Sequence, residues 1–280
     1  MRERWKEAGL GLLNLAVVVG VIMLFQPLIR RYLPTAGAGV LALACFLTYL
    51  AAVRFIERRR PSELEARYAA PEVVAGLVLG FVLFSVVMAL LLALKVYHPA
   101  GRGSARQLAS GFLFALLAGV MEEILFRGLL FRISAKIVGT WGALIFTSAL
   151  FGLAHAANPG ATFASSLAIA LEAGILLGAA YAATQRLWLP IGLHVGWNFT
   201  EGSIFSMNIS GTGIHEGVVR GSLSGPRLLT GGSFGPEASV VAVFVCVAAA
   251  LYFLRRMVKL HRVEPPAFRF RHSPAPLATP

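Results

Sequence analysis

The sequence predicts an all-α protein that crosses a membrane several times. Of its 280 residues, 57% are hydrophobic and only 14% are charged, and the mean hydropathy is +0.74. A chain this apolar has too little polar surface to cover a water-soluble globule. Its apolar residues also fall into separate stretches of the length that a membrane-spanning helix needs, about 20 residues. A polytopic helical membrane protein accounts for both observations.

Eight stretches are predicted to span the membrane. They are Leu10–Ile29, Gly37–Ile56, Val73–Leu94, Leu108–Ser134, Gly142–Ala157, Phe163–Thr184, Trp188–Met207 and Ser239–Met257. Most of the Lys and Arg residues fall in loops on the same side as both termini, which predicts cytoplasmic termini in the inner cell membrane. The net charge of +12 is therefore a topology signal. Because the basic residues form no single stripe, we expect no nucleic-acid partner.

The first three predicted spans are apolar almost throughout and are expected to serve as scaffold and lipid contact. The loop after the second span holds Arg58, Arg59 and Arg60 together with Glu57, Glu63 and Glu65. This mixture predicts a solvated cytoplasmic loop near anionic lipid headgroups. Cys45 and Cys246 both fall inside apolar spans, so we expect packing residues without a disulfide or thiolate metal site.

The fourth span carries Glu122, Glu123 and Arg127 inside its apolar sequence. A charge near the bilayer centre costs roughly 2.5–3.5 kcal/mol on insertion scales, so such residues usually face a protein interior and mark function. Glu123 and Arg127 are four residues apart and can pair on one helix face. Glu122 is rotated about 100° from Glu123 and lacks that partner. Glu122 is therefore the candidate reactive carboxylate.

The fifth and sixth spans add further polar groups. A turn over residues 137–140 precedes the fifth span, which ends at His155, just before the breaker sequence of residues 158–160. The sixth span has Gly174 and Gly178 at a spacing that allows close helix approach. Glu172 lies beside them, and two alternatives stay open: a structural hydrogen bond, or a place in a substrate cavity.

The seventh span begins at Trp188, has Pro190 in its first turn, and presents His194 and Asn198 on one face. Residues 208–237 are rich in Gly and Ser and are predicted to form a loop. The G-x-S-x-G pattern at residues 231–235 is interpreted as a turn, since no strand precedes it and the chain contains no Asp for a triad.

Together, Glu122, His155, His194 and Asn198 supply the groups needed to hydrolyse an amide. The carboxylate can accept a proton from water, one imidazole can orient that water, and the other imidazole with the amide can stabilise an oxyanion. Glu122, His155 and His194 could equally hold a divalent metal such as zinc, with water at the open position. Both alternatives stay open from the residues alone.

These residues resemble the CPBP family of intramembrane proteases, which includes the type II CaaX prenyl endopeptidases. The family motif E-E-x-x-x-R stands at Glu122–Arg127, F-x-x-x-H at Phe151–His155 and H-x-x-x-N at His194–Asn198. The resemblance covers roughly Leu108 to Phe199. It implies that Glu122 and His155 activate water, that His194 and Asn198 form the oxyanion site, and that Glu123 and Arg127 support them.

The sequence therefore predicts an intramembrane endopeptidase, glutamate-type or metal-dependent, with its site between the fourth, fifth and seventh spans. We expect a membrane-associated peptide or protein as substrate and a bacterial source in which prenylated substrates are not expected. No cofactor is favoured, with a divalent metal such as zinc as the alternative. Alternatives are a non-proteolytic scaffold or immunity-type protein, and a proton-coupled transporter. The predicted division is 1–107 for three N-terminal spans, 108–207 for the catalytic core, 208–237 for the loop, and 238–280 for the last span and basic tail.

Overall fold

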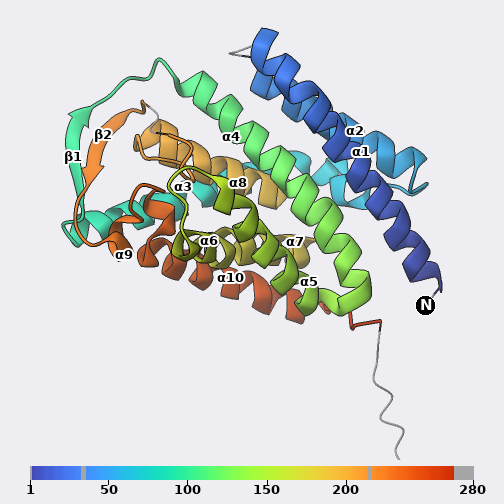
Figure 1. Cartoon of the computed structure of the whole chain (residues 1–280). Helices are drawn as coiled ribbons and strands as arrows, with labels where there is room; N and C mark the ends of the chain where they lie inside the picture. Colours follow the sequence, from blue (N-terminus) through green and yellow to red (C-terminus); the bar gives the residue numbers. More distant parts are fainter. Residues whose placement is uncertain (1, 33–35, 214–215, 268–280) are drawn as a thin grey trace, which may run out of the picture.

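The computed structural model describes residues 2–32, 36–213 and 216–267. Helices make up most of these residues, and Figure 1 shows them as a bundle with a small sheet at one end. The α-helices are α1 (Arg2–Tyr32), α2 (Gly37–Phe55), α3 (Ala69–Ala93), α4 (Leu108–Glu123), α5 (Arg132–Ala154), α6 (Phe163–Ile169), α7 (Ile175–Thr184), α8 (Trp188–Phe199), α9 (Arg227–Thr230) and α10 (Val240–Lys259). The all-α prediction is confirmed.

Several shorter elements join these helices. Three π-helical segments are η3 (Ile124–Phe131), η5 (Ala170–Gly174) and η6 (Thr200–Ile204). Single 3₁₀ turns are η1 (Ser62–Leu64), η2 (Ala66–Tyr68), η4 (His155–Ala157) and η7 (Pro236–Ala238). The strands β1 (Tyr97–Arg102) and β2 (Val219–Leu223) pair antiparallel, with Tyr97 opposite Leu223 and Arg102 opposite Val219.

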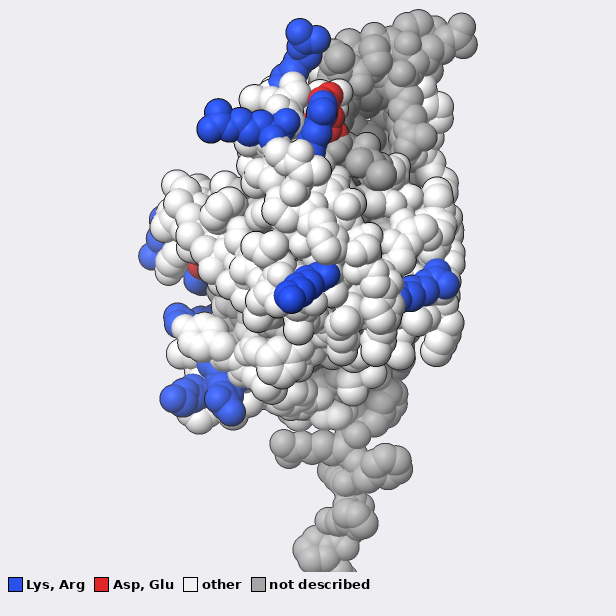
Figure 2. Space-filling view, turned by 90° about the vertical axis from the view of Figure 1, so that its left-hand side faces the viewer, with Lys and Arg blue, Asp and Glu red and all other residues white. Residues whose placement is uncertain are grey.

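Six helical stretches in the described part of the chain are long and apolar enough to cross a membrane. One of them, Leu108–Ala157, bends at Gly139 (φ 76°, ψ 171°), inside the predicted turn over residues 137–140. Helix α8 with η6 corresponds to the predicted seventh span but is not among the six. Figure 2 shows a largely uncharged surface with scattered basic groups, as lipid contact requires. The polytopic class is confirmed, and the count of eight spans stays a prediction.

Gly139 is required at that bend for two reasons. Its positive φ is a conformation that L side chains rarely adopt. A Cβ atom there would also lie 2.8 Å from the carbonyl oxygen of Glu264, whose backbone accepts a hydrogen bond from Thr140 N at 3.0 Å. The segment that follows α10 therefore packs directly on the bend.

Glycines bring α3 and α8 into backbone contact. A Cβ atom added at Gly80 would lie 2.3 Å from Leu193 O, and one at Gly196 would lie 2.4 Å from Leu77 O. Gly76 and Gly192 are blocked in the same way by the opposite backbone. Small residues allow such close approach between membrane helices. Helix α8, which carries His194 and Asn198, is thereby held against α3.

The predicted close approach at Gly174 is also present, since a Cβ atom there would lie 2.9 Å from Ser148 Cα on α5. Cys45 and Cys246 are buried and free, as predicted for packing residues. The Gly-rich residues 231–235 form a turn between α9 and η7, with positive φ at all three glycines. The predicted loop over residues 208–237 contains the short elements β2 and α9 and part of η7.

The prediction of a solvated loop after α2 is wrong for Glu57 and Glu63, while Glu65 is exposed. The side chains of Glu57 and Glu63 are only 4% and 3% exposed. Arg59 bridges them, at 2.7 Å from Glu57 Oε2 and 2.6 Å from Glu63 Oε1. Glu57 Oε1 also accepts hydrogen bonds from Arg132 Nη2 and Asn14 Nδ2, both at 2.7 Å. Buried charges persist when they are paired and hydrogen-bonded, and here they join α1, α5 and the loop.

This network predicts a pH-dependent contribution of Glu57 to stability. Burial raises the pKa of Glu57, but the charge and hydrogen bond of Arg132 and the hydrogen bonds of Arg59 and Asn14 outweigh it, so the pKa is lowered. Such a carboxyl stabilises the fold above its unfolded-state pKa and loses that contribution as the pH falls through its folded-state pKa. Glu57→Gln should cost about 1–3 kcal/mol at neutral pH. The cost should shrink below about pH 4.

Thermal unfolding of the two proteins in detergent across pH measures this difference. Glu65→Gln is the control, because Glu65 lies in the same loop and forms an exposed ion pair with Arg67. A stability gap between wild type and Glu57→Gln that stays constant down to about pH 2.5 would contradict the assignment.

Candidate active site

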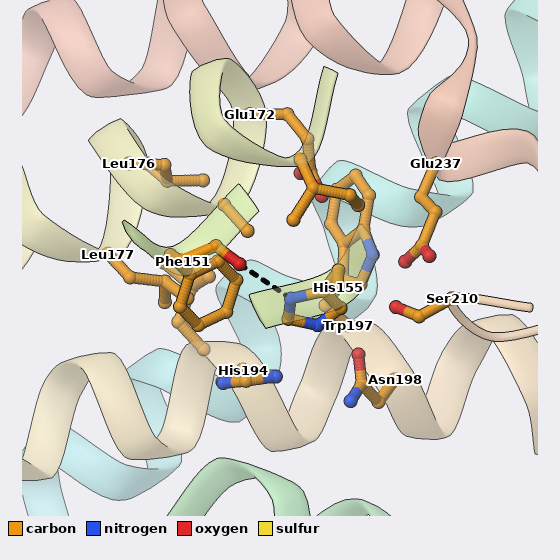
Figure 3. A pocket seen from close by; sticks show the side chains of 13 residues that line it. Phe151, His155, Glu172, Leu176, Leu177, His194, Trp197, Asn198, Ser210 and Glu237 are labelled. Carbon is orange, nitrogen blue, oxygen red and sulfur yellow. Dashed lines mark hydrogen bonds between the residues drawn. The ribbon is translucent and has the colours of Figure 1, made fainter. Parts of the chain in front are cut away.

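Three of the predicted site residues, His155, His194 and Asn198, line a cavity inside the bundle, whereas Glu122, Glu123 and Arg127 are not in its lining. Figure 3 shows His155, His194 and Asn198 around it, together with Phe151 and Trp197. Further polar groups in its lining are Glu172, Ser210 and Glu237. The cavity volume of about 20 Å³ is room for about one water molecule.

Glu122 lies between the two imidazoles. Its Oε2 atom is 3.9 Å from His155 Nε2 and 4.0 Å from His194 Nε2. The side chain is 20% exposed, while Oε2 itself is buried and has no hydrogen-bond partner in the described part of the chain. Separations beyond 3.5 Å between polar atoms are typical of groups bridged by water. The arrangement suits a water molecule held by one carboxylate and two ring nitrogens.

The hydrogen bond of His155 fixes which of its nitrogens faces Glu122. Its Nδ1 atom is 2.8 Å from the carbonyl oxygen of Phe151, drawn as the dashed line in Figure 3. A carbonyl oxygen can only accept, so Nδ1 carries the hydrogen. In the neutral ring Nε2 is then left with a lone pair toward Glu122.

Glu123 connects His194 to a buried arginine. Its Oε1 atom is 2.7 Å from Arg127 Nη1 and 3.0 Å from His194 Nδ1. The side chains of Glu123 and Arg127 are 0% and 1% exposed. The predicted Glu123–Arg127 pair is confirmed, whereas the contact with His194 was not predicted. A carboxylate at Nδ1 orients the ring so that Nε2 points to Glu122.

Arg127 is itself held by groups from other elements. Its Nη2 atom donates to the carbonyl oxygens of Ala173 and Gly174, both at 3.1 Å. Its guanidinium carbon lies 4.7 Å from the centroid of the Phe151 ring, a cation–π distance. Since Ala173 and Gly174 belong to η5 and Phe151 to α5, Arg127 joins three parts of the bundle around the site.

Each π-helical segment adjoins or contains a buried carboxyl group. Segment η3 follows Glu123, η5 contains Glu172, and η6 contains Glu201. Single π-helical turns are rare and are frequently found at functional sites. They shift the helical register locally, although the i, i+4 pair of Glu123 with Arg127 is kept at the start of η3.

A second group of carboxyls lies beside the candidate site residues. Glu172, Glu201 and Glu237 are buried and close enough to interact electrostatically. Both oxygens of Glu201 and Oε1 of Glu237 have no hydrogen-bond partner among the described residues. Three like charges buried without a cation repel one another, so we expect most of them to be protonated. Glu172 lines the cavity and also forms a side-chain hydrogen bond with Cys246 of α10, so both of its alternatives stay open.

Sequence reasoning missed Glu201 and Glu237. Glu201 follows Asn198 by three residues, a spacing that could have signalled a shared helix face. Glu237 lies in η7, and nothing local indicates that this segment folds into the bundle. Trp197, next to Asn198, was also missed, although its buried Nε1 lines the cavity without a hydrogen-bond partner in the described residues.

The metal alternative has a geometric test. Zinc ligands lie about 2.0–2.2 Å from the ion, which puts the donor atoms of a tetrahedral site about 3.4 Å apart. Glu122 Oε2 lies 3.9 Å and 4.0 Å from the two Nε2 atoms. Within the described ranges, no three His, Cys, Asp or Glu side chains are arranged to hold a metal ion. The predicted ligand set, as placed, is therefore too wide for zinc.

The fold and the site define a multi-pass helical membrane protein with a carboxylate and imidazole centre inside its bundle. Residues 104–200 match the model of a protein family described as type II CAAX prenyl endopeptidase Rce1-like. This segment contains all three motifs, and the match supports the predicted resemblance to the CPBP family. No curated protein and no solved structure matches the chain.

Replacing a buried glutamate by glutamine should destabilise the fold strongly at Glu123 and hardly at all at Glu201. Glu123→Gln leaves Arg127 buried without its counter-charge, which should destabilise the fold by about 3–5 kcal/mol. Glu201→Gln replaces a neutral acid by a neutral amide of similar shape and should change stability by less than about 1 kcal/mol. Thermal unfolding in detergent measures both. Equal losses would show that Glu201 is charged and paired.

Proposed function

We propose that this protein hydrolyses a peptide bond of a membrane-associated protein or peptide, using a water molecule activated by Glu122. The supporting observation is the buried, unpartnered Oε2 of Glu122 between the Nε2 atoms of His155 and His194. The family match over residues 104–200 supports the same reaction class.

In the proposed first step, Glu122 accepts a proton from water while Nε2 of His155 orients it through its lone pair. The water oxygen forms a bond to the carbonyl carbon, and the carbonyl π electrons move to oxygen. General-base catalysis of this kind contributes about 10²–10⁴-fold. In the second step the tetrahedral intermediate expels the amine, which receives the proton held by Glu122.

His194 and Asn198 are proposed to donate hydrogen bonds to the oxyanion. Because Nδ1 of His194 faces the Glu123 carboxylate, Nε2 can donate only when the ring is an imidazolium. Glu123 and Glu122 both favour that positive charge by proximity. Asn198 lines the same cavity one helical turn later. Glu123 and Arg127 are thus positioning residues that hold His194.

We also propose that the protein lies in the inner cell membrane with both termini in the cytoplasm. The start of α1 and the described residues after α10 lie at the same end of the bundle (Figure 1), which supports termini on one side. The basic residues around that end support the cytoplasmic side.

A proton-coupled transporter is a second candidate because of Glu172, Glu201 and Glu237. Buried carboxyls that exchange protons are typical of such transporters. The three carboxyls line or adjoin the same cavity as the proposed catalytic groups. Proton uptake coupled to a solute in proteoliposomes, retained by Glu122→Gln, would favour this candidate.

Glu122→Gln tests the proposed function directly. The substitution keeps the shape and removes the base, so hydrolysis should fall by about 10²–10⁴-fold while the protein stays folded. Membranes from cells making wild type or the variant are compared by proteomics for new peptide termini, followed by assay of the cleaved peptide with purified protein. Glu216→Gln is the control, because Glu216 forms an exposed ion pair with Arg220. Wild-type turnover by Glu122→Gln would refute the mechanism.

The metal-free proposal makes a separate prediction for His194. If His194 donates to the oxyanion, His194→Ala should lower the rate by about 10²–10³-fold and leave measurable turnover. Wild type treated with a strong chelator should then keep its activity. Stoichiometric zinc by elemental analysis, lost together with activity on chelation and restored by added zinc, would contradict the proposal.

A further inference from the structure

A groove of about 670 Å³ lies between α3, α7, α8 and α10, on residues other than those of the catalytic cavity. One end of it is charged. The charged residues in its lining are Glu72, Arg186, Arg256 and Arg262. They come from the first turn of α3, the link between α7 and α8, the C-terminal end of α10 and the segment that follows it.

The charged lining residues are three arginines and one glutamate, so positive charge is in excess. Arg186 is neutralised by Glu72, with Nε 2.7 Å from Oε1, and lies 3.9 Å above the Tyr68 ring. Arg256 Nη1 donates to the hydroxyl of Tyr252 at 3.3 Å, and Arg262 Nη1 donates to the carbonyl oxygen of Ala183. Both acceptors are neutral. Arg256 and Arg262 thus bring two positive charges to one end of the groove.

The mutual effect of these charges is seen at Arg262, which lies beyond the end of α10. Burial lowers the pKa of its guanidinium, and the like charges of Arg186 and Arg256 lower it further, with Glu72 opposing them. An anion bound between Arg256 and Arg262 would relieve that repulsion.

The remaining length of the groove is apolar. Ala75, Val78, Leu79 and Val82 follow the i, i+3, i+4, i+7 spacing of a single face of α3, and Phe253 of α10 lines the groove with them. Val78 and Val82 are exposed and lie within a span that is predicted to cross the membrane. This wall is suited to an acyl chain.

We propose that this groove binds one anionic phospholipid of the surrounding leaflet. Its phosphate would lie between Arg256 and Arg262, and an acyl chain would follow the α3 face. Arginine matches phosphate oxygens through its planar, forked donors. Basic pockets between membrane helices are known sites for anionic headgroups. The combination of two unneutralised arginines with an apolar wall distinguishes a phospholipid from a soluble anion or a second copy of the chain.

Native mass spectrometry of the full-length protein tests this proposal. The protein is loaded with phosphatidylglycerol or phosphatidylcholine of identical chains, and the lipid that stays bound is measured. Wild type should retain phosphatidylglycerol about tenfold better than phosphatidylcholine, whereas Arg256→Gln should lose most of that preference. Arg256→Lys should keep part of it, because the charge remains.

Arg255→Gln is the matched control. Arg255 is the exposed neighbour of Arg256 on α10 and does not line the groove, so its substitution should leave the preference unchanged. Equal retention of the two lipids by wild type would overturn the proposal. Equal losses in Arg255→Gln and Arg256→Gln would overturn it as well. Displacement of the lipid by free glycerol phosphate would show an anion site without lipid specificity, which is a third contradicting result.

Discussion

The site depends on one buried carboxylate, Glu123, which contacts a guanidinium and an imidazole at the same oxygen. An arginine buried in this apolar bundle without a counter-charge would cost several kcal/mol. Glu123 supplies that charge, and Arg127 in turn fixes the position of the carboxylate through the backbone of η5. The Glu123 carboxylate, held in this way, orients the His194 ring through Nδ1. The reactive end of the site thus rests on an ion pair that makes no direct contact with the scissile bond in the proposed mechanism.

Close backbone packing preserves this geometry. Helix α8 is held against α3 by glycines on both sides, and the η5 segment meets α5 where Gly174 faces Ser148. Side chains that must stay within about 0.5 Å of a productive geometry are best carried on rigid elements. The π-helical segments add local register shifts that straight helices would not provide. Two of these segments, η5 and η6, carry Glu172 and Glu201, which lie beside the site residues of the three motifs.

Much of the architecture was predictable because bilayer thickness constrains the length of apolar stretches. The bend near Gly139, the Glu123–Arg127 pair and the shared face of His194 and Asn198 follow from local spacing, and the structure has all three. The approach of Glu122 to both imidazoles was expected from the motifs that the chain shares with a known family. Chemical roles for these residues remain proposals.

Other features depend on contacts between distant segments, which local patterns do not encode. The bond between Glu123 and His194 joins residues 71 positions apart in the chain, and Glu237 returns to a cavity that residues of α5 and α8 also line. The burial of Glu57 and Glu63 was missed for the same reason, since their partners include Arg132 of α5 and Tyr49 of α2. A prediction from hydropathy places charged loop residues in solvent, because it contains no information about the distant ion-pair partner that allows their burial.

The most direct test of the account is the protonation of the His194 ring, measured by ¹⁵N NMR of histidine-labelled protein in detergent. Samples of His194→Gln and His155→Gln assign the two signals. The account predicts a protonated Nδ1 on His194 at neutral pH, and a shift of its signal in Glu123→Gln that His155 does not share. An unprotonated Nδ1 on His194 in the wild type would contradict the claim that Glu123 orients this ring.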